Sequence, residues 1–313
     1  MMNRLILLPA LLSLTLALTQ CSRKNIGPST APTAVVVPDP AGAPPKTWKE
    51  HWFDHTQDLT RVFYDDDLAV YYDGDVDKSI TWPFKYVGDV WRYTKKTYGG
   101  HGPDTRLYAV FHTNKYSGGH PDYYFNSAHD FRNVIDCGPG PWLTQAGNID
   151  VPTHEVFHIV ESATFDTKGS PGFGAYPNGI WGDSKFSEIY QYDVYLGLKM
   201  PEEAQRWYDK IVNGKETFPA ANSYWFKDWL FPWYNNYGKT RVLVDFFKLL
   251  ADNFPKDSNN KYTRKMNWGE YIHFSSGAAR TDLKVMATTA FGWKTQWENE
   301  LVKARLDFPR VTY

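Results

Sequence analysis

The sequence predicts an α+β fold in which a small mixed or antiparallel sheet lobe precedes a mostly helical lobe. Two short apolar and aromatic runs that contain valine, 68–72 and 106–112, have the length and composition of buried strands. A helical stretch at 83–97 separates them, and beyond residue 150 the pattern becomes mostly helical. We therefore expect a first lobe over 48–150 and a second over 151–313.

The helical lobe is expected to contain several separate helices. Asn253-Phe254-Pro255 ends one of them, because proline disfavours helical geometry at the residue before it. Asp150, just before Val151-Pro152, is a candidate helix cap, and proline is tolerated in a first turn. The candidate helices cover 151–164, 184–198, 202–212, 239–252, 280–289 and 293–305.

The N-terminal residues are not expected to belong to the fold. In residues 1–20, Arg4 precedes a mainly apolar run that is too short to span a bilayer, as in a signal peptide. Residues 21–47 are rich in proline, alanine and valine, a composition typical of an extended tether. Order is expected to begin near Trp48, with one domain from 48 to 313.

The end of the signal peptide resembles a bacterial lipobox. Leu18-Thr19-Gln20 leads to Cys21, the position at which such proteins carry lipid. This resemblance implies an exported, lipid-anchored protein of the periplasm or cell surface, with no other membrane attachment. A lipidated Cys21 would leave Cys137 as the only other cysteine, so no intramolecular disulfide is expected.

The amino-acid composition indicates which classes of binding partner to expect for the protein. The formal net charge is -1 and the pI is about 6.8, so the basic footprint of a nucleic-acid-binding protein is absent from the sequence. Aromatic residues make up 17% of the chain, which favours a large packed core or an aromatic-lined cleft. We expect a monomer.

The strongest motif is His154-Glu155-Val156-Phe157-His158. On a helix, histidines four residues apart project from one face, so that both imidazoles can bind one Zn²⁺. Glu155 lies beside them and can accept a proton from a water that the metal acidifies. Chance alone would give roughly 0.01 such matches in a chain of this composition.

A zinc site with an open position needs a third protein ligand. The pattern HExxHxxGxxH does not continue here, because Glu161 and Thr164 stand where its glycine and third histidine belong. Glu161 lies too far along the helix from His154 to join one tetrahedron, and we expect it beyond the ligand shell. Glu188, early in the next predicted helix, is the preferred third ligand, with Asp183 as the alternative.

These residues resemble the gluzincin metallopeptidases, a group of zincin-like enzymes with HExxH on one helix and a glutamate ligand on the next. The 29 residues between His158 and Glu188 are closest to the spacing of M60-like secreted peptidases. The resemblance implies Zn²⁺ and hydrolysis of peptide bonds in extracytoplasmic proteins, peptides or glycoproteins, with Glu155 as general base. It also implies a strand above the zinc helix, for which Leu107–Phe111 is the candidate.

A tyrosine or histidine from the helical lobe stabilises the oxyanion in related enzymes. The candidates in this chain are Tyr234, Tyr237 and His273. A different hypothesis is a non-catalytic surface lipoprotein that binds glycan or glycoprotein and holds a structural zinc. The presence of Glu155 between the histidines favours the enzyme, because a structural zinc site does not need a general base.

Two further patterns in the sequence are candidate metal sites. Asp73-Gly74-Asp75-Val76-Asp77 hints at a calcium loop, but Lys78 and Phe84 stand where an EF-hand requires glycine and glutamate, so a solvated acidic turn is favoured. His51 and His55 repeat the four-residue histidine spacing, but no third ligand is evident near them.

Overall fold

The computed structural model describes residues 39–313. The predicted signal peptide, the predicted lipid site at Cys21 and most of the predicted tether lie outside the described residues. The chain divides into two units, Met1–Gly42 and Ala43–Tyr313, and the second contains the sheet and all of the helices described below. It has the α+β architecture that the sequence predicts.

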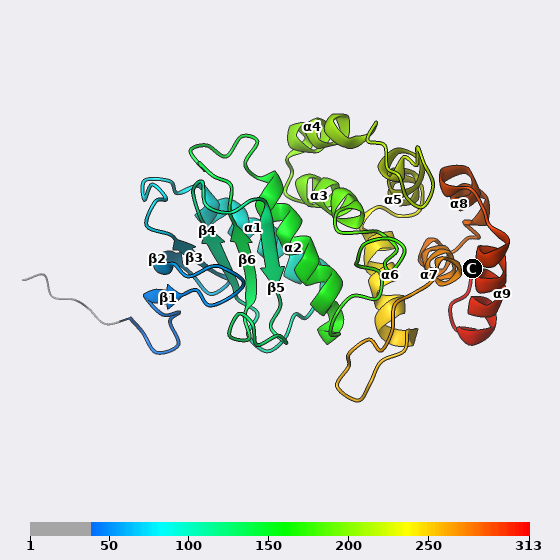
Figure 1. Ribbon diagram of the computed structural model, residues 1–313, viewed down its shortest axis with the longest axis horizontal. Coiled ribbons are helices and arrows are strands. Elements are labelled where there is room, and N and C mark those ends of the chain that lie inside the picture. The colour runs from blue at the N-terminus through cyan, green and yellow to red at the C-terminus, as the bar shows by residue number, and fades with distance from the viewer. Residues whose placement is uncertain (1–38) are drawn as a thin grey trace, which may run out of the picture. The chain divides into compact units, whose positions relative to one another are not determined.

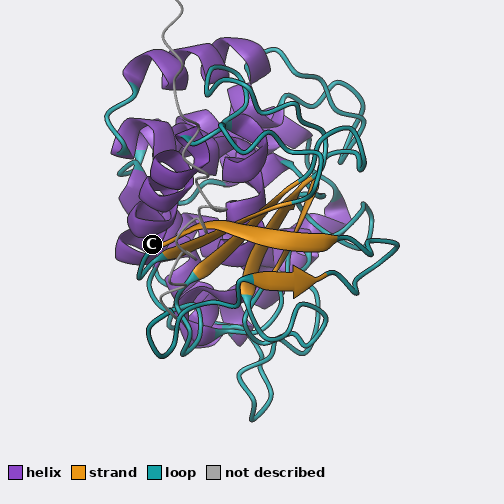
Figure 2. Ribbon diagram, turned by 90° about the vertical axis from the view of Figure 1, so that its left-hand side faces the viewer, coloured by secondary structure: helices purple, strands orange, loops and turns teal. Residues whose placement is uncertain are grey.

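A six-stranded mixed sheet forms the first part of this unit, with strand order β1-β2-β3-β4-β6-β5 (Figures 1 and 2). The pairs β3–β4 and β4–β6 are parallel and the other pairs are antiparallel. The strands are β1 (Thr47–Lys49), β2 (Asp58–Tyr64), β3 (Leu68–Tyr72), β4 (Leu107–Phe111), β5 (Gly119–Asp122) and β6 (Asn133–Cys137).

Helix α1 (Trp82–Tyr98) connects β3 to its parallel neighbour β4, as a parallel pair requires a long crossover. Most of the other helices follow the sheet in sequence and lie to its right in Figure 1. They are α2 (Asp150–Ala163), α3 (Lys185–Gly197), α4 (Pro201–Ile211), α5 (Phe231–Asn236), α6 (Thr240–Asn253), α7 (Trp268–Ala279), α8 (Lys284–Phe291) and α9 (Thr295–Asp307), with a 3₁₀ turn at Thr164–Asp166 and a π-helical segment at Trp225–Leu230. Within residues 39–313, every helix is too short or too polar to cross a lipid bilayer.

The predicted helices match observed ones, but the sequence pattern does not predict the short helix α5 or the longer helix α7. Nearly every side chain of α7 is buried, including Gly269, Ser275 and Ser276. A helix buried on all sides has no polar face, so it lacks the amphipathic spacing by which the others were recognised. The π-helical segment at Trp225–Leu230 is also absent from the predicted helices; four of its six residues are buried aromatic or leucine side chains.

Both faces of the sheet are covered. Leu68, Val70 and Tyr72 of β3 face the helical core, whereas Ala69 and Tyr71 face a second cluster that contains tryptophans of the β1 region. Strands buried on both faces read as continuous apolar runs, which is why β3 and β4 were visible in the sequence. The twelve largest fully buried side chains are all tryptophan or tyrosine, so the aromatic content mainly fills the core.

Asp150 does not cap α2 as predicted but joins α2 to its neighbours. Its carboxylate accepts hydrogen bonds from the Tyr195 hydroxyl of α3 and from Arg206 and Lys210 of α4. Burial alone would raise the pKa of Asp150, but the bonds from Arg206, Lys210 and Tyr195 outweigh it and lower that pKa. The carboxylate therefore stabilises the contact between three helices in its charged form.

Asp150→Asn is expected to lower the free energy of unfolding by about 1–3 kcal/mol at neutral pH, because Arg206 and Lys210 lose their charged acceptor. Since the folded pKa is lower than the unfolded one, this stabilisation is complete above the ordinary aspartate pKa and disappears as the pH falls through the folded value. Urea unfolding of both proteins at pH 7 and pH 3 measures it. Asp209→Asn, an exposed change on α4, is the control. A difference as large at pH 3 as at pH 7 would contradict the assignment.

Candidate metal centre

Helix α2 carries the two histidines of the HExxH motif beside strands β5 and β6 (Figure 1). His154 and His158 lie one turn apart on the same face, and their Nε2 atoms are 3.1 Å apart. Both atoms can therefore reach one metal ion, as the spacing predicts. A zinc ion binds nitrogen and oxygen ligands tetrahedrally at about 2.0–2.2 Å. Two ligand atoms of one zinc ion therefore lie about 3.3–3.6 Å from each other.

Asp183 supplies the third ligand atom of this group. Its Oδ2 lies 4.0 Å from His154 Nε2, and its Oδ1 lies 3.8 Å from His158 Nε2. Two imidazole nitrogens and one carboxylate oxygen lie within 4.8 Å of one another, so the three residues could hold a metal ion. The two Asp183 contacts are slightly longer than those between the ligands of a bound zinc ion. The Asp183 side chain is 70% exposed, so the group is open to solvent on that side.

Glu188, the preferred third ligand in the sequence analysis, is not brought to the histidines. Its Oε1 accepts a hydrogen bond from Lys185 Nζ, which also pairs with Glu216. Successive residues of a helix are about 100° apart around the axis. Because Ser187 faces His154, its neighbour Glu188 points elsewhere, and Asp183 before the helix takes the position instead.

Hydrogen bonds hold both imidazoles with Nε2 toward the shared position. The Ser187 hydroxyl donates to the Ser184 carbonyl, so its oxygen accepts from the Nδ1–H of His154 at 3.0 Å. His158 Nδ1 is 2.6 Å from Glu161 Oε1, and the other oxygen of Glu161 accepts from Trp181 Nε1. Glu161 thus lies beyond the ligand shell, as expected, and these partners leave both Nε2 lone pairs for a metal.

The surroundings of these groups shift their pKa values strongly. Burial and the neighbouring His158 lower the pKa of His154 to about 4. Burial also opposes the charge of His158, but the hydrogen bond to Glu161 and the nearby carboxylates of Glu161, Glu155 and Asp183 together outweigh burial and raise that pKa to about 9. Glu155 is 5% exposed, and burial raises its pKa to about 8. A carboxyl group with a pKa near neutrality is suited to accept and return a proton.

A cleft of about 380 Å³ opens in front of the motif. One wall is α2, with Glu155 and His158, and the other is β5, with Gly119 and His120. β5 is an edge strand of the sheet. Leu107–Phe111, the candidate strand above the zinc helix, has no free edge to receive an extended peptide, because β4 pairs with β3 and β6 on its two sides.

The three candidates for an oxyanion donor lie elsewhere. Tyr234 is buried and its hydroxyl donates to Asp193. His273 contacts the Phe308 carbonyl and the Tyr313 hydroxyl near the C-terminus. Neither these two residues nor Tyr237 lines the cleft at Glu155. Polar side chains of a helical lobe often have structural partners, and the sequence does not distinguish them from catalytic ones.

A second group of side chains that could hold a metal ion lies on the other face of the sheet. It consists of the buried residues Glu50, His55, His112 and Asp136. The exposed His51 does not join His55 there but contacts Asp130. Glu50, His112 and Asp136 are not predicted as metal ligands from the sequence, although His112 ends the predicted strand run 106–112.

Asp73, the first residue of the acidic turn, does not begin a calcium loop. Its carboxylate binds His112 and Lys115 instead. The prediction of a solvated acidic turn is therefore wrong for Asp73, which is buried and bonded to other side chains.

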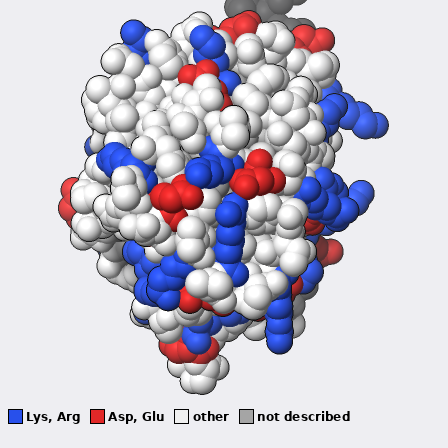
Figure 3. All heavy atoms as spheres, turned by 90° about the vertical axis from the view of Figure 1, so that its right-hand side faces the viewer, with Lys and Arg blue, Asp and Glu red and all other residues white. Residues whose placement is uncertain are grey.

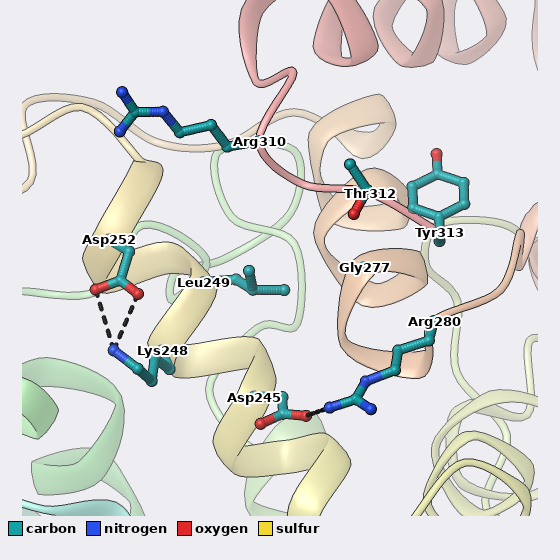
Figure 4. A pocket seen from close by; sticks show the side chains of 9 residues that line it. All are labelled: Asp245, Lys248, Leu249, Asp252, Gly277, Arg280, Arg310, Thr312 and Tyr313. Carbon is teal, nitrogen blue, oxygen red and sulfur yellow. Dashed lines mark hydrogen bonds and ion pairs between the residues drawn. The ribbon is translucent and has the colours of Figure 1, made fainter.

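Another hollow, of about 580 Å³, lies between α6, α7 and the C-terminal residues and shares no lining residue with the cleft. Four of its charged side chains form two pairs, Lys248 with Asp252 and Asp245 with Arg280 (Figure 4). On the face at the right of Figure 1, basic and acidic side chains are interspersed (Figure 3). Neither the hollow nor this charged face brings together metal-binding side chains of the kind found beside Glu155.

The chain matches no protein-family model and no curated protein. The geometry of the site is therefore the basis for assigning a function.

Proposed function

We propose that the chain is a zinc-dependent peptidase in which Glu155 is the general base. The observation that carries the proposal is the convergence of His154, His158 and Asp183 beside the buried Glu155. Three protein ligands with an open side are the donor set of catalytic zinc, whereas a structural zinc is closed by a fourth protein ligand. Zinc bound there would acidify water and polarise the scissile carbonyl.

Glu155 moves the protons of the proposed reaction. Its carboxylate accepts a proton from the attacking water and later gives that proton to the nitrogen of the leaving amine. Ser187 and Glu161 keep the two imidazoles in place through their Nδ1 atoms. Substrates would be extracytoplasmic proteins, peptides or glycoproteins, in keeping with the lipobox-like N-terminus.

The free edge of β5 offers a surface for an extended peptide. The Gly138 N–H donates to the Gly118 carbonyl, and in this antiparallel register His120 faces Asp136 of β6. The main-chain groups that point away from β6 are then those of Gly119 and Pro121, because they alternate along a strand. A peptide can add there through the N–H and C=O of Gly119 and the C=O of Pro121.

Cleavage of a peptide library, read by mass spectrometry, tests the proposal. We expect hydrolysis that stops after treatment with a zinc chelator and returns after one equivalent of Zn²⁺ is added. Binding of glycoprotein without any cleavage would instead support the glycan-binding alternative. Two exposed aromatic side chains, Phe53 and Phe173, line the cleft and could contact a sugar in that case.

Gly119→Ala is expected to lower kcat by about 10–100-fold with the metal retained. A Cβ on Gly119 would lie 2.7 Å from Cγ and Oε1 of Glu155, so the carboxylate must move. Steady-state kinetics and metal analysis measure the two effects. Gly74→Ala is the matched control, because its Cβ would meet nothing within 4 Å. Wild-type kcat in Gly119→Ala would show that Glu155 tolerates the displacement.

A further inference from the structure

We propose that Glu50, His55, His112 and Asp136 form a second site for a divalent transition metal, separate from the HExxH centre and structural in role. The four residues come from segments far apart in sequence. Glu50 and His55 lie in the connection between β1 and β2, His112 follows β4, and Asp136 belongs to β6. A metal bound by all four would hold the 50–57 connection against the ends of the parallel strands.

The distances within this group suit one ion. His112 Nε2 lies 2.9 Å from Glu50 Oε1 and 3.1 Å from Asp136 Oδ1. His55 Nδ1 lies 3.0 Å from Asp136 Oδ2 and 3.8 Å from Glu50 Oε1. These separations are close to the spacing of about 3.3–3.6 Å between ligands of a tetrahedral metal.

Burial of these polar side chains would cost free energy if no metal ion were bound between them. The side chains of Glu50, His112 and Asp136 are fully buried. Glu50 Oε1, His112 Nε2 and Asp136 Oδ1 face one another, yet none of the three takes part in a hydrogen bond of acceptable geometry. Buried polar atoms are almost always partnered, and three unpartnered ones that converge on one point indicate a ligand there.

The remaining atoms of these side chains are held by outer partners. His112 Nδ1 lies 2.9 Å from Asp73 Oδ2, and Lys115 binds the same oxygen. Such a carboxylate–histidine pair is the usual support of a metal-binding imidazole. Glu50 Oε2 accepts the N–H of Gln57, which fixes the glutamate from behind.

Trp52 holds Asp136 in a similar way, because its Nε1–H donates to Asp136 Oδ2 at 2.9 Å. The ring of His55 stacks on Tyr116, with centroids 3.3 Å apart. Each of the four proposed ligands is therefore oriented by a neighbour that does not itself belong to the group.

The donor set indicates the kind of metal. Two imidazoles and two carboxylates suit zinc and similar first-row divalent ions, whereas calcium and magnesium prefer oxygen alone. One divalent cation balances the charges of Glu50 and Asp136. Four protein ligands leave no open position for substrate, which is typical of a structural zinc site.

The second site lies behind the edge strand of the cleft. His120 of β5 lines the cleft, and its Nε2 is 3.3 Å from Asp136 Oδ2. Asp136 also pairs with His120 in the β5–β6 register. Loss of the second metal is therefore expected to loosen β5 as well as the 50–57 connection.

Metal analysis of the purified protein, loaded with Zn²⁺ and freed of excess, tests this proposal independently of peptidase activity. We expect two equivalents in the wild type and one in His154→Ala/His158→Ala. In that double variant, Glu50→Gln/Asp136→Asn should remove the remaining equivalent, while His51→Ala, at the exposed neighbouring histidine, should not. One equivalent in the wild type and none in the double variant would overturn the site.

Cobalt provides a measurement that does not depend on changing the buried group. In His154→Ala/His158→Ala, added Co²⁺ should give the visible absorption of a four-coordinate nitrogen and oxygen site, and Zn²⁺ should displace it. Absence of this absorption in the folded variant would mean that a protonated His112 bridges Glu50 and Asp136 as an ion-pair network. That result would overturn the second metal site and leave the proposed peptidase untouched.

Discussion

Replacing Glu155 with glutamine is expected to lower kcat for peptide hydrolysis by about 10²–10⁴-fold, the usual contribution of a general base. Glutamine has nearly the same shape, so the cleft between α2 and β5 should keep its form. The amide cannot accept the proton of the attacking water. Burial raises the pKa of the native carboxyl to about 8, so Glu155 gains and loses its proton at a pH much closer to neutrality than an exposed glutamate does.

The same variant should bind zinc as tightly as the wild type, because Glu155 is not among the three converging ligands. Single-turnover cleavage of a fluorogenic peptide and metal analysis of the same sample separate the two properties. Glu202→Gln, an exposed change on α4, controls for the loss of one carboxylate. Cleavage at the wild-type rate in Glu155→Gln would contradict the proposed role of Glu155.

The features that the sequence revealed are local ones. The spacing of His154 and His158 determines their common face on any helix, and the structure has α2 there. Strands β3 and β4 were recognised because burial on both sides makes them continuously apolar. Short strands such as β5, with glycine, histidine, proline and aspartate, carry no such signal.

The features that could not be read from the sequence depend on contacts across the chain. Glu50 and Asp136 are 86 positions apart and meet only because the 50–57 connection lies against His112 after β4 and Asp136 of β6. Tyr234 and His273 carry suitable groups, but each is occupied by a structural partner that lies far away in sequence. Only the folded chain decides which polar side chains remain available.

The third ligand illustrates the same limit on a smaller scale. Glu188 was preferred because it lies within a helix and is rigidly held, and this reasoning placed the helix correctly at Lys185–Gly197. It did not determine which side of α3 faces α2. Ser187 faces His154, and this rotation directs Glu188 toward Lys185. Asp183, in the segment before the helix, comes to lie beside both histidines.

Asp183→Ala is therefore expected to weaken zinc binding at the HExxH centre and to lower kcat/KM by about 100-fold or more. Removal of an outer partner of a metal ligand already costs about 10–100-fold, and removal of a ligand itself should cost at least as much. The Asp183 side chain is exposed, so the alanine variant should fold normally. Zinc titration against a competing chelator and peptide cleavage at saturating zinc measure the two effects.

Glu188→Ala is the matched control, because the two carboxylates compete for the same role in the sequence. It removes the partner of Lys185 near the cleft but no atom of the converging group, so zinc affinity should stay near that of the wild type. The opposite result, with zinc lost in Glu188→Ala and kept in Asp183→Ala, would restore the glutamate ligand of the gluzincins. It would also require α3 to turn by about one residue, or 100°, when the metal binds.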